Sequence, residues 1–369
     1  MSSTEPPEAR IVAAVPPARP VRVGAGEKLR TTSLPGLTLN VRTRPPAVSG
    51  LPPAVFLHGL GGCSQNWSPL MERLADRLDI EAPDLPGFGD SPPPDDGDYS
   101  ITGHARAVIR LLDAGGRGPV HLAGNSMGGT IAIRVAAVRP DLVRSLTLVS
   151  PALPERRPQR TAVPTGLLAI PGATRLFSRA TRGWDAERRT RELLALTYGD
   201  PRQVGQEDFA LAVEEYERRL ALPYFWDALA RSARGLIDSY TLGGQHALWR
   251  QAERVLAPTL LVYGMRDQLV AFRTARRASA TFRDSRLLTL LDAGHVAMME
   301  YPEAVARSMR ELLDDVDGRP VDEADGSEEQ DVPDGSDRPD GREARDGRDS
   351  RKTGGVPVPG TDGSGAARG

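Results

Sequence analysis

Short apolar runs alternate with amphipathic segments between about residue 24 and residue 316. Near-continuous apolar runs of strand length, bounded by turn residues, are typical of strands buried in a parallel sheet. This pattern predicts strands at Leu37–Thr43, Ala54–Leu57, Ile80–Ala82, Val120–Ala123, Leu146–Val149, Leu260–Tyr263 and Leu287–Leu291.

Several of the intervening segments carry apolar residues three or four positions apart, which is the spacing of a helix with one buried face. We expect helices at Trp67–Leu78, Ile101–Leu112, Met127–Val138, Arg273–Phe282 and Pro302–Leu313. Strands that alternate with helices in this way predict an α/β fold, a mostly parallel sheet flanked by helices.

The alternation stops at Pro151 and resumes at Thr259, and the residues between are helical in pattern, rich in arginine and rich in aromatic side chains. An insertion into the sheet order is the simplest account. We therefore expect a core built from residues 24–150 and 257–316, with a helical cap over residues 151–256.

The two ends of the chain differ from this core in composition. Proline recurs within residues 1–23, which predicts a flexible N-terminal segment. Residues 317–369 hold 14 acidic and 8 basic side chains and no aromatic residue, which predicts a disordered, mildly acidic tail. The N-terminus lacks a secretory pattern and no run approaches the length of a membrane span, so we expect a cytoplasmic protein without an integral membrane segment.

Overall composition narrows the function classes further. The net charge is only −2, which gives no general reason to expect nucleic acid or an anionic membrane as a partner. Cys63 is the single cysteine, so an intramolecular disulfide is excluded, and no Cys/His pair has zinc spacing. We expect neither a metal nor a cofactor.

The sharpest motif is Gly124-Asn-Ser126-Met-Gly128, which follows an apolar strand and precedes an amphipathic helix. In a G-x-S-x-G turn of this kind the serine is exposed at the end of the strand as a nucleophile, and the helix N-terminus directs N–H groups at a developing oxyanion. The motif predicts Ser126 as nucleophile and the backbone N–H of Met127 as one oxyanion donor.

A serine nucleophile needs a base, and the base needs a carboxylate that orients it. Asp267 follows the predicted strand at Leu260–Tyr263, and His295 follows the next one. Catalytic residues gather at the carboxyl ends of parallel strands, so these positions predict His295 as base and Asp267 as its partner. Asp292 is a second, weaker candidate for that acid.

The second oxyanion donor is expected in a loop after an early strand, and Phe56-Leu-His58-Gly59-Leu60-Gly61-Gly62 has the glycines that such a loop needs. Leu60 is the preferred donor through its backbone N–H. We expect His58 to orient this loop, and Cys63 beside it to fill space as a small apolar side chain.

Together these residues resemble the α/β-hydrolase superfamily. The likeness covers about residues 24–316 and rests on His58-Gly59-Leu-Gly61-Gly62, Asp84-Leu-Pro-Gly87-Phe-Gly89, Gly124-Asn-Ser126-Met-Gly128-Gly129, Asp267 and Gly294-His295. The resemblance implies an eight-stranded, mostly parallel sheet with a cap inserted after the sixth strand. It also implies the triad Ser126, His295 and Asp267. The dehalogenase and epoxide hydrolase branches carry aspartate where this chain has Ser126, so the resemblance disfavours those activities.

The resemblance leaves several activities open. The preferred one is cleavage of a carboxylic ester with an apolar acyl or alcohol part, because the cap is rich in aromatic residues. A carbon–carbon bond hydrolase of the meta-cleavage product type is the first alternative, since residues 294–301 are also similar to that branch, and a cap arginine would then hold the substrate carboxylate. Acyltransferases and nonenzymatic, hydrolase-like binding proteins also belong to the superfamily, although a binding protein would normally have a broken triad.

Overall fold

The computed structural model describes residues 24–46, 48–155 and 157–318. The predicted segment 1–23, and the predicted tail beyond Gly318, lie outside these residues. Within the described part of the chain, no helix is both long enough and apolar enough to cross a membrane.

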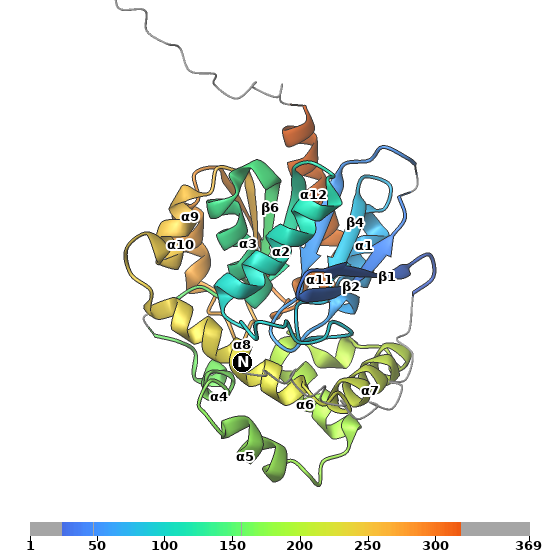
Figure 1. Cartoon of the computed structure of the whole chain (residues 1–369), viewed down its shortest axis with the longest axis vertical. Coiled ribbons are helices and arrows are strands. Elements are labelled where there is room, and N and C mark those ends of the chain that lie inside the picture. Colours follow the sequence, from blue (N-terminus) through green and yellow to red (C-terminus); the bar gives the residue numbers. More distant parts are fainter. Residues whose placement is uncertain (1–23, 47, 156, 319–369) are drawn as a thin grey trace, which may run out of the picture. The chain divides into compact units, whose positions relative to one another are not determined.

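One sheet of eight strands organises the described residues, in the order β1-β2-β4-β3-β5-β6-β7-β8 (Figure 1). The pairs β1–β2 and β2–β4 are antiparallel and all the others are parallel, so the predicted α/β fold with a mostly parallel sheet is confirmed. The strands are β1 (Lys28–Leu34), β2 (Leu37–Arg44), β3 (Pro53–Leu57), β4 (Asp79–Pro83), β5 (Val120–Asn125), β6 (Val143–Val149), β7 (Thr259–Gly264) and β8 (Ser285–Leu290).

Alternate residues of the central strands bury their side chains on opposite faces of this sheet. Val55 and Leu57 pack on one face with α2 (Ile101–Gly115), α3 (Met127–Val138), α9 (Leu248–Arg254) and α10 (Arg273–Thr281). Ala54 and Phe56 pack on the other face with α1 (Ser68–Leu74), α11 (Ala297–Glu300) and α12 (Pro302–Asp317). Because both faces are covered, the strands can be apolar throughout, as their sequences are.

Two elements differ from the sequence prediction. Strand β1 was not predicted because its first four residues are exposed and its sequence, KLRTTSL, is mostly polar, as an edge strand allows. The helix predicted at Trp67–Leu78 is shorter: a 3₁₀ turn at Ser64–Trp67 leads into α1, which ends at Leu74. The N–H of Leu78 still donates to the carbonyl of Leu74, so the chain closes one more turn before β4.

The residues between β6 and β7 form the remaining helices, α4 (Val163–Leu167), α5 (Ala173–Ala180), α6 (Ala186–Thr197), α7 (Gln206–Leu220) and α8 (Phe225–Thr241), followed by α9. We call residues 151–256 the insertion. Its last helix, α9, packs against α3. The rest contacts the loops that follow the carboxyl ends of strands: Gln159 Nε2 donates to the carbonyl of Asp267 at 2.8 Å after β7, and Arg219 donates to the carbonyl of Gly61 after β3.

Candidate active site

Ser126 occupies the turn between β5 and α3 in a strained backbone conformation, with φ 53° and ψ −116°. Positive φ is unusual for a residue other than glycine and marks a turn that the surrounding structure imposes. The flanking glycines permit this turn. A Cβ atom on Gly124 would lie 2.4 Å from the carbonyl oxygen of Gly128, and a Cβ on Gly128 would lie 2.3 Å from the carbonyl oxygen of Leu57.

Hydrogen bonds attach this turn to the loop that carries His295. The N–H of Ser126 donates to the carbonyl of Val149 at 3.0 Å. The side-chain amide of the preceding residue, Asn125, donates to the carbonyl oxygens of Val149 at 3.1 Å and of His295 at 2.9 Å. The buried Asn125 therefore fixes the strand end that bears Ser126 against the backbone of His295.

His295 and Asp267 form the pair that the sequence predicts. Nδ1 of His295 lies 2.9 Å from Oδ2 of Asp267, and both side chains are buried. The other carboxylate oxygen of Asp267 accepts the N–H groups of Leu269 at 2.8 Å and Val270 at 2.9 Å. Burial alone would raise the pKa of Asp267, but His295 and these two N–H donors hold it below its ordinary value. The carboxylate is thus charged and fixed beside the imidazole.

The alternative acid does not reach the imidazole. Asp292 is exposed and pairs with Arg266 at 2.6 Å. Within the described residues, no hydrogen bond joins Ser126 Oγ to His295. Catalytic hydrogen bonds are commonly long or misaligned in unliganded enzymes and tighten in complexes.

The predicted oxyanion segment passes directly against Ser126. A Cβ on Gly59 would lie only 3.2 Å from Cβ of Ser126. The N–H of Gly62 donates to the carbonyl of Gly59 at 3.0 Å, and Gly61 has a φ of +72°, so Leu60 and Gly61 form the centre of a tight turn. Met127 is the first residue of α3, where the helix offers its N–H no acceptor.

His58 is held in one tautomer by two backbone groups. Its Nε2 accepts the N–H of Leu85 at 2.9 Å, so its Nδ1 is the donor to the carbonyl of Gly59 at 2.8 Å. Burial, more than its other surroundings, lowers the pKa of His58 to about 4. A neutral imidazole with both nitrogens engaged can orient the loop but has no free atom to act as a base.

A buried cluster joins α7 to this same loop. The carboxylate of Glu215 accepts Nε and Nη2 of Arg218, each at 2.8 Å, and Nη1 of Arg218 reaches Asp90 at 2.5 Å. Arg219 donates to the carbonyl of Gly61. Cys63 is a buried free thiol beside the cluster, and burial raises its pKa. Its thiol is also a hydrogen-bond partner of the Glu215 carboxylate, and this contact helps to lower the pKa of Glu215.

One polar residue near His295 was missed from the sequence. The two carboxylate oxygens of Glu300 accept the N–H of Gly294 at 2.8 Å and the N–H of Gly199 at 2.7 Å. Gly294 precedes His295 and Gly199 lies in the insertion, so Glu300 bridges the two segments. The sequence contains Glu300 within the segment 294–301, but only the fold shows that its hydrogen-bond donors are backbone N–H groups far apart in the chain.

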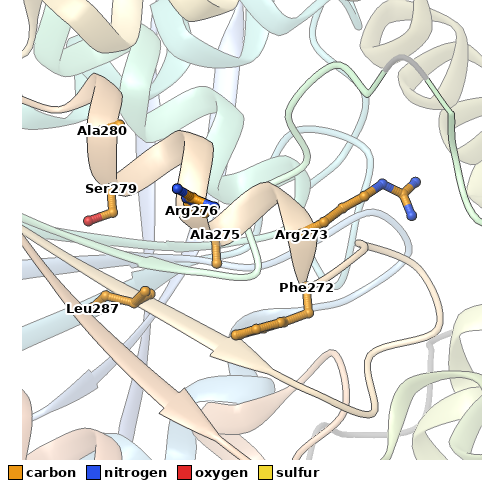
Figure 2. A pocket seen from close by; sticks show the side chains of 7 residues that line it. All are labelled: Phe272, Arg273, Ala275, Arg276, Ser279, Ala280 and Leu287. Atoms are coloured by element: carbon orange, nitrogen blue, oxygen red, sulfur yellow. The ribbon is translucent and has the colours of Figure 1, made fainter.

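A surface hollow of about 490 Å³ lies elsewhere, beside α10 and β8 at the sheet edge. Figure 2 shows its lining, which comprises Phe272, Arg273, Ala275, Arg276, Ser279, Ala280 and Leu287. None of these residues belongs to the candidate triad or to the oxyanion segment. Over the described residues, no three His, Cys, Asp or Glu side chains are arranged to hold a metal ion.

Comparison with known sequences identifies the family. The sequence model of the alpha/beta hydrolase fold family matches residues 52–302. The chain belongs to the alpha/beta hydrolase family. The match begins just before β3 and extends to the start of α12, so it contains every residue of the candidate site.

Curated relatives within this family differ in activity. The chain is 26% identical over 268 residues to a monoacylglycerol lipase of Xenopus laevis, covering 71% of this chain and 75% of the relative. It is 30% identical over 268 residues to haloalkane dehalogenase 2 of Mycobacterium tuberculosis, covering 70% and 87%. It is 29% identical over 253 residues, 68% of this chain, to the dihydrolipoyllysine-residue acetyltransferase component of an acetoin cleaving system from Cupriavidus necator, and spans only 60% of that relative.

Solved structures show the same fold. A bacterial membrane phospholipase A superposes with a TM-score of 0.65 at 25% identity, over 80% of this alpha/beta hydrolase and 88% of the phospholipase. A meta-cleavage product hydrolase from Pseudomonas fluorescens superposes with a TM-score of 0.63 at 20% identity, over 78% and 97%. At 20% identity, the similarity to the meta-cleavage product hydrolase shows a shared fold and nothing more.

Proposed function

We propose that this alpha/beta hydrolase is a serine hydrolase that cleaves carboxylic esters with an apolar acyl or alcohol part. The observation that carries the proposal is the buried His295–Asp267 pair, with Nδ1 and Oδ2 2.9 Å apart, on a loop that Asn125 fastens to the turn of Ser126. A serine at this turn supports ester chemistry over dehalogenation, because the dehalogenase branch uses aspartate there.

In the proposed mechanism, Nε2 of His295 takes the hydroxyl proton as Ser126 Oγ attacks the ester carbonyl carbon. The N–H groups of Leu60 and Met127 hold the negative oxygen of the tetrahedral intermediate. The intermediate collapses to an acyl-enzyme as His295 passes the proton to the departing alcohol. Water then attacks the acyl carbon, again giving a proton to His295, and the acid leaves as Ser126 regains its hydrogen. Asp267 stays ionised throughout and stabilises the imidazolium.

Apolar side chains next to the oxyanion segment support an apolar substrate. A Cβ on Gly61 would lie 3.3 Å from Leu229 of α8, and Leu60 packs in the same cluster as Phe225 and Trp226. By contrast, the two buried arginines in the described part of the insertion, Arg218 and Arg219, are already engaged by Glu215, Asp90 and backbone carbonyls. This pairing counts against the carbon–carbon hydrolase alternative, which needs an arginine for a substrate carboxylate.

The test is a series of p-nitrophenyl esters of increasing acyl length, assayed with the wild type and with Ser126→Ala. Each added buried methylene contributes about 0.8 kcal/mol, so kcat/KM should rise about fourfold per methylene until the site is full. Ser126→Ala should lose about 10³-fold or more in kcat while keeping its melting temperature. Weak turnover at every length with rapid turnover of a dienoic keto-acid would favour the carbon–carbon alternative instead. Failure on both would favour a binding protein.

A further inference from the structure

Residues 157–184, at the start of the insertion, expose an unusual concentration of apolar side chains. Of the 15 large hydrophobic side chains that are exposed among the described residues, five lie in this segment: Val163, Leu167, Ile170, Leu176 and Phe177. Leu176 is 71% exposed and Ile170 is 53% exposed. Single exposed apolar residues are ordinary, but contiguous ones mark interaction surfaces.

The segment is a structured part of the insertion. Both α4 and α5 contact α8. The ring of Phe177 packs edge-on against Trp226 of α8 with 6.0 Å between ring centroids. Figure 1 shows α4 and α5 on the side of α8 that faces away from the sheet. Leu176, next to Phe177 in α5, remains exposed.

The charge of this segment is all of one sign. It contains Arg157, Arg160, Arg175, Arg179 and Arg182 and no acidic residue. All five arginines are exposed, and none forms an ion pair within the part of the chain that the structure describes. Most other arginines of the described chain have carboxylate partners, and the whole chain carries a net charge of −2. The concentration is therefore a local property of this surface.

We propose that residues 157–184 form a docking surface for an anionic lipid bilayer. Apolar side chains such as Leu176 would enter the boundary between headgroups and acyl chains, and the arginines around them would bind lipid phosphates. In a symmetric dimer through this face, the arginines of one copy would lie against the arginines of the other. Repulsion between these like charges disfavours such a dimer. This surface binding is independent of the proposed ester hydrolysis.

The net charge of the whole chain, −2, gives no general reason to expect an anionic membrane as a partner. The five arginines of residues 157–184 nevertheless make this one face locally positive. A chain docked through residues 157–184 would meet the bilayer with one part of the insertion, whose helix α6 contacts the His295 loop through Thr197.

The test is sedimentation of the full chain with sucrose-loaded vesicles, either of pure phosphatidylcholine or of phosphatidylcholine mixed with phosphatidylglycerol. The test variants are Arg175→Glu with Arg179→Glu, and Leu176→Ser. The matched controls are Arg276→Glu with Arg307→Glu, which makes the same charge change on α10 and α12, and Leu256→Ser, an apolar position outside the segment that is 58% exposed. Melting temperatures establish that all variants fold.

The wild type should partition onto the mixed vesicles at least about tenfold more strongly than onto pure phosphatidylcholine, and less as salt is added. Both test variants should lose about tenfold or more of this binding while the controls retain it. The proposal is overturned if the wild type ignores anionic vesicles, or if the control variants lose as much binding as the test variants. It is also overturned if size-exclusion chromatography shows a dimer that Leu176→Ser dissociates, because the face would then be an interface between copies.

Discussion

The backbone N–H of His295 donates a 2.7 Å hydrogen bond to the carbonyl oxygen of Thr197, the last residue of α6. Beside this bond Gly199 and Gly294 approach so closely that neither could carry a side chain. A Cβ on Gly199 would lie 2.0 Å from the carbonyl oxygen of Asp292, and a Cβ on Gly294 would lie 2.5 Å from the nitrogen of Gly199. The insertion is therefore fastened to the loop of the proposed base, and a displacement of one segment should displace the other.

Glu300 holds this junction, and its replacement should affect catalysis through His295. In Glu300→Gln a single carbonyl oxygen replaces the two acceptors for Gly199 and Gly294, which leaves one buried N–H without a partner. A lost hydrogen bond of this kind costs about 1–3 kcal/mol. We expect kcat for an ester to fall about tenfold or more, with KM changed by less than about twofold. Steady-state kinetics and melting temperature are measured together.

The matched control is Glu303→Gln, which changes an exposed glutamate on the neighbouring helix that pairs with Arg73. It should leave kcat unchanged. If Glu300→Gln lowers the melting temperature but not kcat, Glu300 stabilises the fold without positioning His295.

Asp267 and Asp292 give a second matched comparison, because both were candidates for the acid of the triad. Asp267→Asn should reduce kcat by about 10³–10⁴-fold, since an amide favours the wrong imidazole tautomer and cannot stabilise the imidazolium. Asp292→Asn should change kcat little, because its carboxylate pairs with Arg266 at the surface. Ester hydrolysis at neutral pH measures both. The opposite order of effects would show that Asp292 is the acid.

Buried histidines should make the protein sensitive to acid. Burial, with a smaller contribution from Arg144, lowers the pKa of His121 to about 4, against about 6.5 for an exposed histidine. Between these values the unfolded chain binds a proton that the folded chain does not, so the free energy of unfolding contributed by this group falls as pH decreases from about 6.5 to about 4.

His121→Asn removes that proton and retains a polar group beside Ser145, whose Oγ lies 2.7 Å from Nδ1 of His121. Its melting temperature should therefore decrease less than that of the wild type between pH 7 and pH 4.5. His246→Asn, at an exposed position, should follow the wild type. If the melting temperatures of the wild type and of His121→Asn decreased equally between pH 7 and pH 4.5, His121 would not be a source of the acid sensitivity.

The alternation of strands and helices in the core and the position of the serine turn could be predicted from the sequence because both depend on local patterns. Gly124 and Gly128 stand on either side of Ser126, and the apolar residues before and after them have strand and helix spacing. For Asp267 and His295, the sequence could indicate only that both residues lie at the same edge of the sheet, just after the carboxyl ends of β7 and β8. The structure brings these two side chains to within 2.9 Å.

The supporting contacts could not be predicted in the same way. Glu300 and Asn125 act on backbone groups that lie far away in the sequence, and no residue pattern indicates which carbonyl or N–H such a side chain will meet. Ser150, at the end of β6, has a positive φ of 45° that is imposed by its buried surroundings. The exposed face at residues 157–184 likewise appears only when the packing of α4 and α5 on α8 is known.

The central claim is that Ser126 is a nucleophile activated by His295 and Asp267, and labelling with a fluorophosphonate measures this most directly. The wild type should take up one equivalent of label, peptide mapping should place it on Ser126, and Asp267→Asn should react far more slowly. Ser126→Ala, folded and at the same concentration, should take up none. A wild type that stays unlabelled, or a Ser126→Ala variant that is labelled as fast as the wild type, would contradict the account.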